Sequence, residues 1–297
     1  MIIGVPATSA NLGPGFDALG LALSLRNRFH VQRAEREEIL DCEVGCDGAD
    51  NLFLVAARRA AGLVGRELPS LRVRFEASVP VARGLGSSAT LIIGGILAAR
   101  ELLGPEGAEV LDEGAVLDLA ASIEGHPDNT TPAFLGGFAV SVLEGGRTVA
   151  IRKALGTGLA FSALVPPFPL ETSVARAVLP ATVPFADAAA NAGRAALVTA
   201  AFLSGDWDML GMAMRDRLHE PWRAPLIPGF EEMKEGARRA GALAVWLSGA
   251  GPTVLAASHG GDAAFARRMD ALCATMGPRP WRHLLLEADD AGATVIA

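Results

Sequence analysis

Residues Pro80–Thr90, with the sequence P-V-A-R-G-L-G-S-S-A-T, join an alternating, strand-like run at Leu71–Val79 to a helical run at Leu91–Leu103. The two glycines of the stretch let the backbone adopt positive φ or approach a ligand closely, and the two serines stand where a helix N-cap is expected. Free backbone N–H groups at a helix start, together with the positive end of the helix dipole, attract anions. The stretch therefore predicts a phosphate-binding loop, to which the hydroxyls can add hydrogen bonds or a metal ligand. An ordinary glycine-rich turn is the plain alternative.

The same letters fit other nucleotide-binding patterns less well. Gly84–Ala89 matches G-x-G-x-x-A, but that fingerprint follows a buried parallel strand, whereas the alternation of apolar and charged residues over 71–76 indicates a strand with one solvent-facing side. A Walker A loop requires Gly-Lys-Ser/Thr, and the two lysines of the chain, Lys153 and Lys234, are followed by Ala and Glu. We therefore exclude a P-loop and disfavour a Rossmann fold.

Composition limits the classes of function. A chain of 297 residues is long enough for two domains or one large one. Its net charge of -7, without a basic block, argues against a nucleic-acid partner. The uncharged run at 84–99 is too short and too polar to span a bilayer, and the first 25 residues lack the Lys or Arg that a secretory signal needs. We expect a cytoplasmic protein without a membrane segment.

The three cysteines, Cys42, Cys46 and Cys273, form no disulfide framework. Cys42 and Cys46 lack the second pair or the nearby histidine that a zinc site requires, so we expect reduced structural thiols and no zinc.

Apolar periodicity and turn residues predict strands and helices in mixed order. The N-terminal part is expected to form a short strand at Ile2–Val5 and a long loop at Pro6–Gly20, and a short helix is expected to begin at Thr131 and Pro132. Further helices are predicted at 52–64, 112–124, 185–203, 207–218, 230–240 and 263–276, and further strands at 138–143, 147–151, 159–165, 242–247, 253–257 and 281–286. This mixture, with antiparallel hairpins, is typical of an α+β fold in two layers.

Four parts of the chain collect polar residues that packing does not explain. They are Asn11 with Asp17, the Pro80–Thr90 loop, Glu124 with His126, Asp128 and Asn129, and the arginines Arg176 and Arg223. A carboxylate beside a serine hydroxyl is a normal Mg²⁺ pair next to phosphates. The plain alternatives are a solvated helix end for Glu124, a structural hydrogen bond for His126 and surface charges for the arginines. The turn at Ser248–Thr253 is either another anion-binding turn or a tight strand connection.

Taken together, these stretches resemble the GHMP kinases. Pro80–Thr90 is similar to the second motif of that superfamily, P-A-T-S-A-N-L-G-P-G-F-D-A-L-G at 6–20 to the first, and W-L-S-G-A-G-P-T-V-L at 246–255 to the third, in the same order. Within the superfamily, E-G-H-P-D-N at 124–129, F-L-G-G at 134–137, A-R-A-V-L-P at 175–180 and H-E-P-W-R-A-P-L-I-P-G-F at 219–230 resemble the homoserine kinase family. The resemblance covers nearly the whole chain.

The resemblance implies an N-terminal ribosomal-protein-like α+β domain at 1–155, which binds ATP, and a C-terminal ferredoxin-like domain at 156–297. It also implies that Ser88 and Glu124 hold Mg²⁺ and that Asn51 borders the adenine pocket. By the same similarity the residues around the ATP phosphates are Pro80, Val81, Ala82, Arg83, Gly84, Leu85, Gly86, Ser87, Ser88, Ala89 and Thr90.

The implied substrate is L-homoserine, whose side-chain hydroxyl receives a phosphoryl group from ATP to give O-phospho-L-homoserine for threonine synthesis. The implied substrate-binding residues are Asn11, Asp17, His126, Asn129, Arg176 and Arg223. Such a zwitterion needs an anion for its ammonium group, for which Asp17 is the candidate, and arginine forks for its carboxylate, for which Arg176 and Arg223 are the candidates. The family is thought to work without an obvious general base, so we assign none and keep Asp17 and His126 as candidates.

Two alternatives stay open at this point. The chain could be another GHMP kinase, acting on mevalonate or a sugar, or a ligand sensor without turnover, and a homodimer is left open as its assembly. Two departures from the family pattern are Thr130-Thr131-Pro132, where many relatives have Val-Ala-Pro, and the short spacing from Glu124 to His126, which weakens the equivalence of Glu124.

Overall fold

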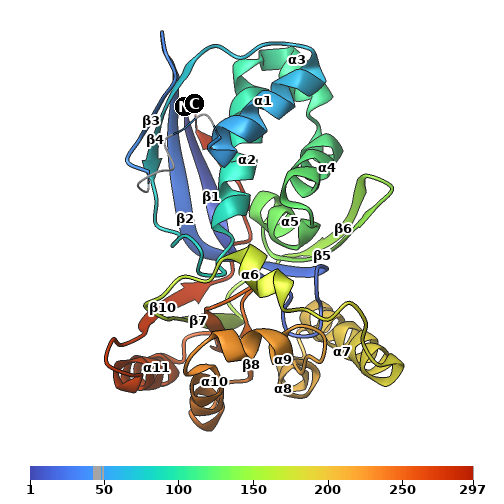
Figure 1. Cartoon of the computed structure of the whole chain (residues 1–297), viewed down its shortest axis with the longest axis vertical. Coiled ribbons are helices and arrows are strands. Elements are labelled where there is room, and N and C mark those ends of the chain that lie inside the picture. The colour runs from blue at the N-terminus through green and yellow to red at the C-terminus, as the bar shows by residue number, and fades with distance from the viewer. Residues whose placement is uncertain (43–47, 49, 297) are drawn as a thin grey trace.

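Two β-sheets organise the structure, a computed structural model that describes residues 1–42, 48 and 50–296 (Figure 1). The first sheet has the strand order β11-β1-β2-β4-β3, and the hairpin of β5 and β6 extends from β2. All of its pairings are antiparallel except that of β3 with β4. The strands are β1 Ile2–Ala10, β2 Leu19–Arg33, β3 Glu38–Leu40, β4 Leu71–Glu76, β5 Phe138–Glu144, β6 Arg147–Lys153 and β11 Thr294–Ile296.

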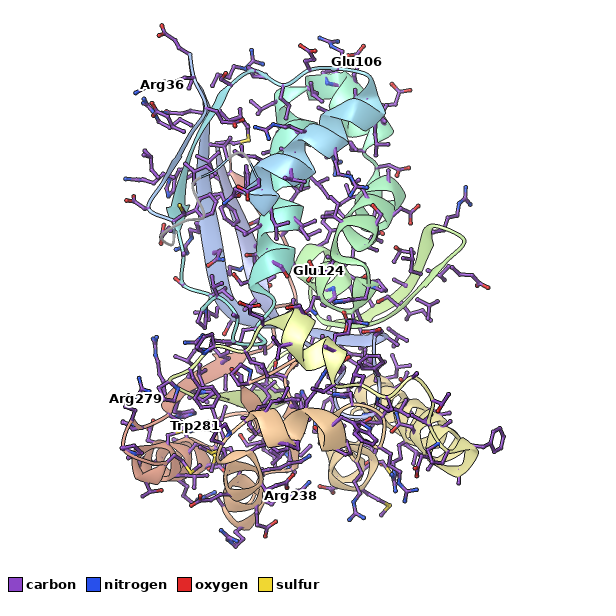
Figure 2. The ribbon with its side chains drawn as sticks, in the orientation of Figure 1. Arg36, Glu106, Glu124, Arg238, Arg279 and Trp281 are labelled. Atoms are coloured by element: carbon purple, nitrogen blue, oxygen red, sulfur yellow. The ribbon has the colours of Figure 1, made fainter. Side chains whose placement is uncertain are left out.

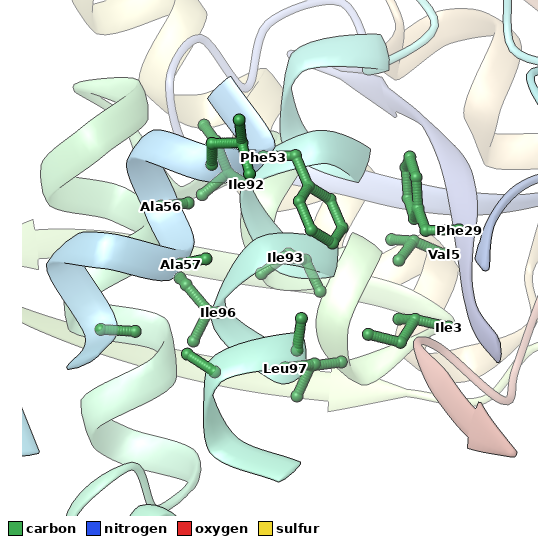
Figure 3. Close-up of a cluster of buried hydrophobic side chains, with 14 of the residues drawn as sticks. Ile3, Val5, Phe29, Phe53, Ala56, Ala57, Ile92, Ile93, Ile96 and Leu97 are labelled. Atoms are coloured by element: carbon green, nitrogen blue, oxygen red, sulfur yellow. The ribbon is translucent and has the colours of Figure 1, made fainter. Parts of the chain in front are cut away.

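Five helices complete the first lobe (Figure 1). They are α1 Leu52–Val64, α2 Ser87–Leu102, α3 Gly104–Val110, α4 Glu113–Glu124 and α5 Pro127–Leu135. Of these, α2, α4 and α5 contact the sheet directly. Helix α2 lies centrally, because most of its residues are apolar and buried on all sides. Figure 3 shows its Ile92, Ile93 and Ile96 beside Phe53 of α1 and Phe29 of β2, all within one apolar core. This core fixes the N-terminus of α2, where the glycine-rich loop enters it.

The second lobe is built on an antiparallel sheet of order β10-β7-β9-β8. Its strands are β7 Leu159–Val165, β8 Ala244–Leu247, β9 Val254–His259 and β10 Arg282–Glu287. Its helices are α6 Thr172–Ala177, α7 Phe185–Ser204, α8 Leu210–Ala213, α9 Glu220–Arg223, α10 Phe230–Arg239 and α11 Ala263–Thr275, with 3₁₀ turns at Trp207–Met209 and Ala224–Leu226. Two apolar clusters form its core, and one of them continues into β1 and β2 of the first lobe.

The end of the chain returns to the first lobe, where β11 pairs with β1 (Figure 1). Arg26 on β2 secures this return: its Nε and Nη2 donate to both carboxylate oxygens of Asp289 at 2.7 Å. Asp290, the next residue, accepts hydrogen bonds from the backbone N–H groups of Leu155 and Gly156, where the chain passes between the lobes. The predicted division of the chain into 1–155 and 156–297 stays a prediction.

The α+β class predicted from the sequence is confirmed, and several element boundaries are wrong. Strand β1 runs to Ala10, so the loop predicted from Pro6 begins at residue 11. Helix α5 begins at Pro127 and contains Pro132, because the proline at its first position already satisfies a helix start. The predicted helix at 207–218 is a 3₁₀ turn followed by the four-residue α8. Strand β11, with only three residues, was not predicted.

Two further expectations concern the cysteines and membrane spans. Cys46 lies outside the described residues, so the interpretation of Cys42 and Cys46 has no structural counterpart here. Within residues 1–42, 48 and 50–296, the helices are too short or too polar to cross a bilayer.

Candidate active site

A cavity of about 430 Å³ lies where the two lobes meet. Its wall contains residues of the 11–18 loop, of the glycine-rich loop, of the α4–α5 connection and of α6 and α9. Figure 2 shows Glu124, one of these residues, at the level where the upper and lower lobes come together. Most of the residues predicted for the site border this cavity, and its size is within the range of small-molecule sites.

The glycine-rich loop ends in Gly86, which is the N-cap of α2 and has φ of 70°. Ser87 and Ser88 are therefore the first two residues of the helix and not its cap, which corrects the expectation from the sequence. The first backbone N–H groups of an α-helix have no partner within the helix. With the glycine cap and the two hydroxyls at this end, α2 presents an anion-binding terminus to the cavity.

Contacts from both lobes hold this loop. The Leu85 carbonyl accepts a hydrogen bond from Thr8 N–H at 3.0 Å, and the Gly84 carbonyl accepts one from Ser248 Oγ at 2.6 Å. At the start of the loop, Asn27 Oδ1 accepts the backbone N–H groups of Ser78 and Val79 at 2.9 Å. Ser248 therefore belongs to a turn that braces the loop, an arrangement that supports the strand-connection interpretation of 248–253.

Gly84 lies close to the backbone of the Ser248 turn. A Cβ atom at this position would lie 2.3 Å from the Ser248 carbonyl oxygen, and the φ of Gly84 is +71°. Gly145, in the β5–β6 turn, has a comparable φ of +59°, but a Cβ there would meet nothing within 4 Å.

We expect Gly84→Ala to lower the free energy of unfolding by about 1–3 kcal/mol more than Gly145→Ala, because only Gly84→Ala adds an overlap to the cost of positive φ. Urea unfolding of both variants measures this difference. Equal destabilisation of the two variants would show that the Ser248 turn leaves room for a Cβ atom at position 84.

Ser88 and Glu124 meet on the wall of the cavity. Ser88 Oγ donates a hydrogen bond to Glu124 Oε1 at 2.5 Å. Burial raises the pKa of Glu124, while the Ser88 hydrogen bond and the charge of His126 oppose that rise. A partly buried carboxylate next to a hydroxyl oxygen at an anion-binding helix terminus is a donor set that suits Mg²⁺, which prefers oxygen ligands and binds together with substrate phosphates. The residues present therefore fit the metal site expected from the sequence.

Three titratable groups gather opposite this pair. Donor atoms of Asp17, His126 and Asp128 all lie within 4.8 Å of one another. His126 Nδ1 is 2.5 Å from Asp128 Oδ1, and Asp128 is only 1% exposed. Burial alone would lower the pKa of His126, but the hydrogen bond and charge of Asp128, with Glu124 and Asp17, raise it. The surroundings of His126 therefore favour its protonated form.

The two predicted asparagines are fixed by hydrogen bonds. Asn11 Nδ2 donates to the Gly249 carbonyl at 2.9 Å, and Asn11 Oδ1 accepts Asp17 N–H at 3.0 Å. Asn129 Oδ1 accepts the Thr8 hydroxyl at 2.7 Å. Asn11 is thus part of the join between the lobes as well as of the cavity wall.

Asp17 and Arg176, expected to bind opposite ends of a zwitterion, bind each other in this structure. Arg176 Nη1 and Nη2 donate to the two carboxylate oxygens of Asp17 at 3.1 and 2.9 Å. Both side chains are partly exposed, and both residues border the cavity. The pair joins the 11–18 loop to α6 at the cavity wall.

Arg223 is a buried cation, 1% exposed. Its Nε donates to the Ala175 carbonyl at 3.1 Å and its Nη1 to the Gly249 carbonyl at 3.2 Å. Burial and the nearby positive charge of Arg176 lower the pKa of Arg223 to about 10, so it remains protonated at neutral pH. Its neutral carbonyl partners leave its positive charge available to an anion in the cavity.

His219 is a buried neighbour of Arg223 and contacts its guanidinium group. Its Nε2 lies 2.8 Å from the Gly13 carbonyl, to which only a protonated nitrogen can donate, and its Nδ1 lies 3.3 Å from Arg223 Nη1. Burial lowers the pKa of His219, and the charge of Arg223 lowers it further, against the opposing charges of Asp216 and Glu220. The imidazole is therefore neutral at neutral pH.

This neutral state predicts a loss of stability in acid. The unfolded chain binds a proton at His219 below the ordinary pKa of 6.5, whereas the folded chain does not, so stability falls as the pH falls through that value. We expect the free energy of unfolding to drop by up to about 1.4 kcal/mol per pH unit more in the wild type than in His219→Gln, whose amide can still donate to Gly13. Urea unfolding between pH 7.5 and 5 compares the two proteins, and parallel curves would contradict the assignment.

Asn51 was expected beside an adenine ring. It is the N-cap of α1, where its Oδ1 accepts the Phe53 N–H at 2.9 Å, and it borders the cavity together with Asp50 and Leu52. Asn51 thus lies on the cavity wall and also caps α1.

Some residues of the site were missed or left without a role. Asp128 was noted in the sequence as one of an unusual group but was not assigned, and its burial against His126 could not be foreseen. Phe16 carries no polar atom and gave no signal, yet both arginines contact its ring. His219 could have been found, since it opens the same short segment as Arg223.

Comparison with known proteins agrees with this geometry. The chain matches the family model of the GHMP kinases N terminal domain at residues 51–137 and that of the GHMP kinases C terminal domain at residues 194–273. It is 43% identical over 279 residues to a homoserine kinase of Moorella thermoacetica, covering 90% of this chain and 93% of that one.

Two further relatives extend the similarity over the whole length. A homoserine kinase of Clostridium botulinum (strain Kyoto / Type A2) is 39% identical over 292 residues, covering 98% of this chain and 97% of the relative. The crystal structure of homoserine kinase from Cytophaga hutchinsonii superposes with a TM-score of 0.87 at 27% identity, covering 100% of this chain and 97% of the other. The two-lobe architecture expected from the sequence is thereby confirmed.

Proposed function

Since the chain belongs to the homoserine kinase family of the GHMP kinases, we propose that it transfers the γ-phosphoryl group of ATP to the side-chain hydroxyl of L-homoserine, giving O-phospho-L-homoserine and ADP. The observation that carries the proposal is the cavity wall on which an anion-binding helix terminus, a partly buried serine–glutamate pair and two arginines converge. This set suits a phosphate donor at one end and an acceptor with a carboxylate at the other.

The nucleotide side is assigned to the glycine-rich loop. The loop at 80–90, of which residues 81–84 and 86–88 border the cavity, encloses the ATP phosphates, with the N-terminus of α2 directed at their charge. Ser88 and Glu124 would hold Mg²⁺, which neutralises phosphate charge when bound. Asn51, Asp50 and Leu52 border the space left for the base.

The substrate side is assigned to the 11–18 loop, α6 and α9. Arg223 binds the substrate carboxylate, because its buried charge has only carbonyl and imidazole partners. Asp17 receives the substrate ammonium and shares its charge with Arg176. Arg176 borders the same cavity and contributes a second guanidinium group to the carboxylate.

No side chain is assigned as a general base. Asp17 is occupied by Arg176, and the neighbouring carboxylates favour the protonated form of His126, so neither is well prepared to accept a proton. In the transfer, the substrate hydroxyl oxygen bonds to the γ-phosphorus, the bond to the ADP oxygen breaks, and the hydroxyl proton leaves with the phosphorylated product or to solvent. Most of the rate acceleration in such a transfer comes from positioning of the reactants and neutralisation of charge. Asn129, His126 and Asn11 contribute to the positioning.

The product feeds threonine biosynthesis, and the cytoplasm, where ATP is supplied, is the proposed location. A homodimer is retained as a proposal for the assembly.

The function is tested by ADP release with Mg-ATP and a panel of L-homoserine, D-homoserine, L-threonine, L-serine, mevalonate and galactose. Turnover confined to L-homoserine is expected. Turnover of mevalonate or galactose instead would overturn the substrate and keep a GHMP kinase, and ATP binding without any turnover would favour a ligand sensor.

A further inference from the structure

We propose that Phe16 is a positioning residue for recognition of the substrate carboxylate, because its ring holds the guanidinium groups of Arg176 and Arg223 together at the cavity. This inference rests on the proposed function and assigns a role to a residue that has no polar atom of its own.

The contacts are direct. The guanidinium carbon of Arg176 lies over the Phe16 ring, 5.6 Å from its centroid, and that of Arg223 lies over the ring at 5.4 Å. Both distances are within the range in which the ring's negative face attracts a cation. The imidazole of His219, which also contacts Arg223, lies 5.4 Å from Phe16, with 30° between the rings. One aromatic side chain thus contacts both arginines and the histidine that supports one of them.

The arrangement solves an electrostatic problem. Two arginines that converge on one carboxylate repel each other before that carboxylate arrives, and the charge of Arg176 is one of the causes that lower the pKa of Arg223. Asp17 compensates Arg176 through two hydrogen bonds, but Arg223 has no such carboxylate hydrogen bond among those found for the described residues. The face of Phe16 therefore supplies part of the attraction that keeps Arg223 near Arg176.

The backbone fixes the ring in place. Gly15, just before Phe16, leaves no room for a side chain, since a Cβ there would lie 2.2 Å from Leu19 Cγ. Ala18 and Leu19 donate their N–H groups to the Gly15 carbonyl, and Asp17, with φ of 54°, donates its N–H to Asn11 Oδ1. Phe16 thus stands in a tight, hydrogen-bonded turn, which fixes the backbone from which its ring reaches the two arginines.

The test compares Phe16→Leu and Phe16→Met, which keep apolar bulk without an aromatic face, with Phe16→Tyr, which keeps the face. Phe185→Leu is the matched control, because Phe185 is 88% exposed at the start of α7. Two acceptors are used: L-homoserine, and 3-aminopropan-1-ol, which has the hydroxyl and the ammonium but no carboxylate. Both are assayed for kcat and KM at saturating Mg-ATP, with enzyme concentration raised for the weaker acceptor, and the KM for ATP is measured separately at saturating L-homoserine.

We expect the Leu and Met variants to raise the KM for L-homoserine about tenfold, because the lost cation–π attraction corresponds to about that factor in binding. The KM for ATP should stay unchanged. The preference for L-homoserine over 3-aminopropan-1-ol should fall by the same factor, and Phe16→Tyr should largely restore it. An equal loss on both acceptors, or no loss in either variant, would overturn the role of Phe16. Failure of the wild type to phosphorylate L-homoserine would instead overturn the proposed function, so the two failures are distinguishable.

Discussion

Replacing Glu124 by glutamine is expected to lower kcat about 10²–10³-fold, the scale of losing a group that stabilises transition-state charge. Glutamine has nearly the same shape and can still accept the hydrogen bond of Ser88 Oγ, so the cavity wall should stay intact. Only the charge that suits a metal ion is removed. The measurement is steady-state turnover of L-homoserine over a range of Mg²⁺ concentrations.

Thermal unfolding of the same variant separates chemistry from folding. Burial raises the pKa of Glu124, which means that folding disfavours its ionised form, so the neutral glutamine should be at least as stable as the wild type at neutral pH. Asp112→Asn, a change at the exposed N-cap of α4, serves as the matched control and should retain activity. An active Glu124→Gln protein would remove Glu124 from the metal site.

Replacing Arg223 by alanine is expected to raise the KM for L-homoserine about 10²–10³-fold, the cost of removing one partner of a buried, hydrogen-bonded charge pair. Arg223→Lys should recover little, because an ammonium group cannot reproduce the fork that reaches both the Ala175 carbonyl and the cavity. Initial rates as a function of L-homoserine and of ATP give the two KM values.

Arg239→Ala, at an exposed arginine on α10, is the control for loss of a positive charge. It should leave both KM values near those of the wild type. If Arg223→Ala raised the KM for ATP and for L-homoserine alike, Arg223 would act through the structure of the lobe junction and not through the substrate carboxylate.

Local signals in the sequence predicted much of the fold. The glycine-rich loop, the capped helix α1 and the β5–β6 hairpin each depend on residues a few positions apart, so their caps and turns are visible in the sequence. The errors have physical causes. Two prolines five residues apart, Pro127 and Pro132, both satisfy a helix start, and only the packing of α5 selects the first.

The helix expected at 207–218 fails for a similar reason. Its periodic apolar residues do face the core, since Leu210 and Ala213 are buried. The Asp216 carboxylate, however, accepts the N–H groups of residues 218–220 and so begins α9 instead. Competition between two helix starts is settled by tertiary contacts that periodicity does not contain.

The chemistry of the site was predicted from residue types, but its pairings were not. Asp17 and Arg176 are 159 residues apart, and nothing near either of them shows that they form an ion pair with each other. The same holds for the contact of Phe16 with both arginines. The motifs shared with a known family identified the candidate site residues. Which of these residues contact one another is seen only in the structure.

The most direct test of this account is phosphorus NMR of the wild-type protein with Mg-ATP and L-homoserine. The account predicts a new phosphomonoester signal, that of O-phospho-L-homoserine, which grows in equal amount with ADP while inorganic phosphate stays at background. Formation of ADP with inorganic phosphate alone, or no change in the ATP signals despite binding, would contradict phosphoryl transfer to L-homoserine at this cavity.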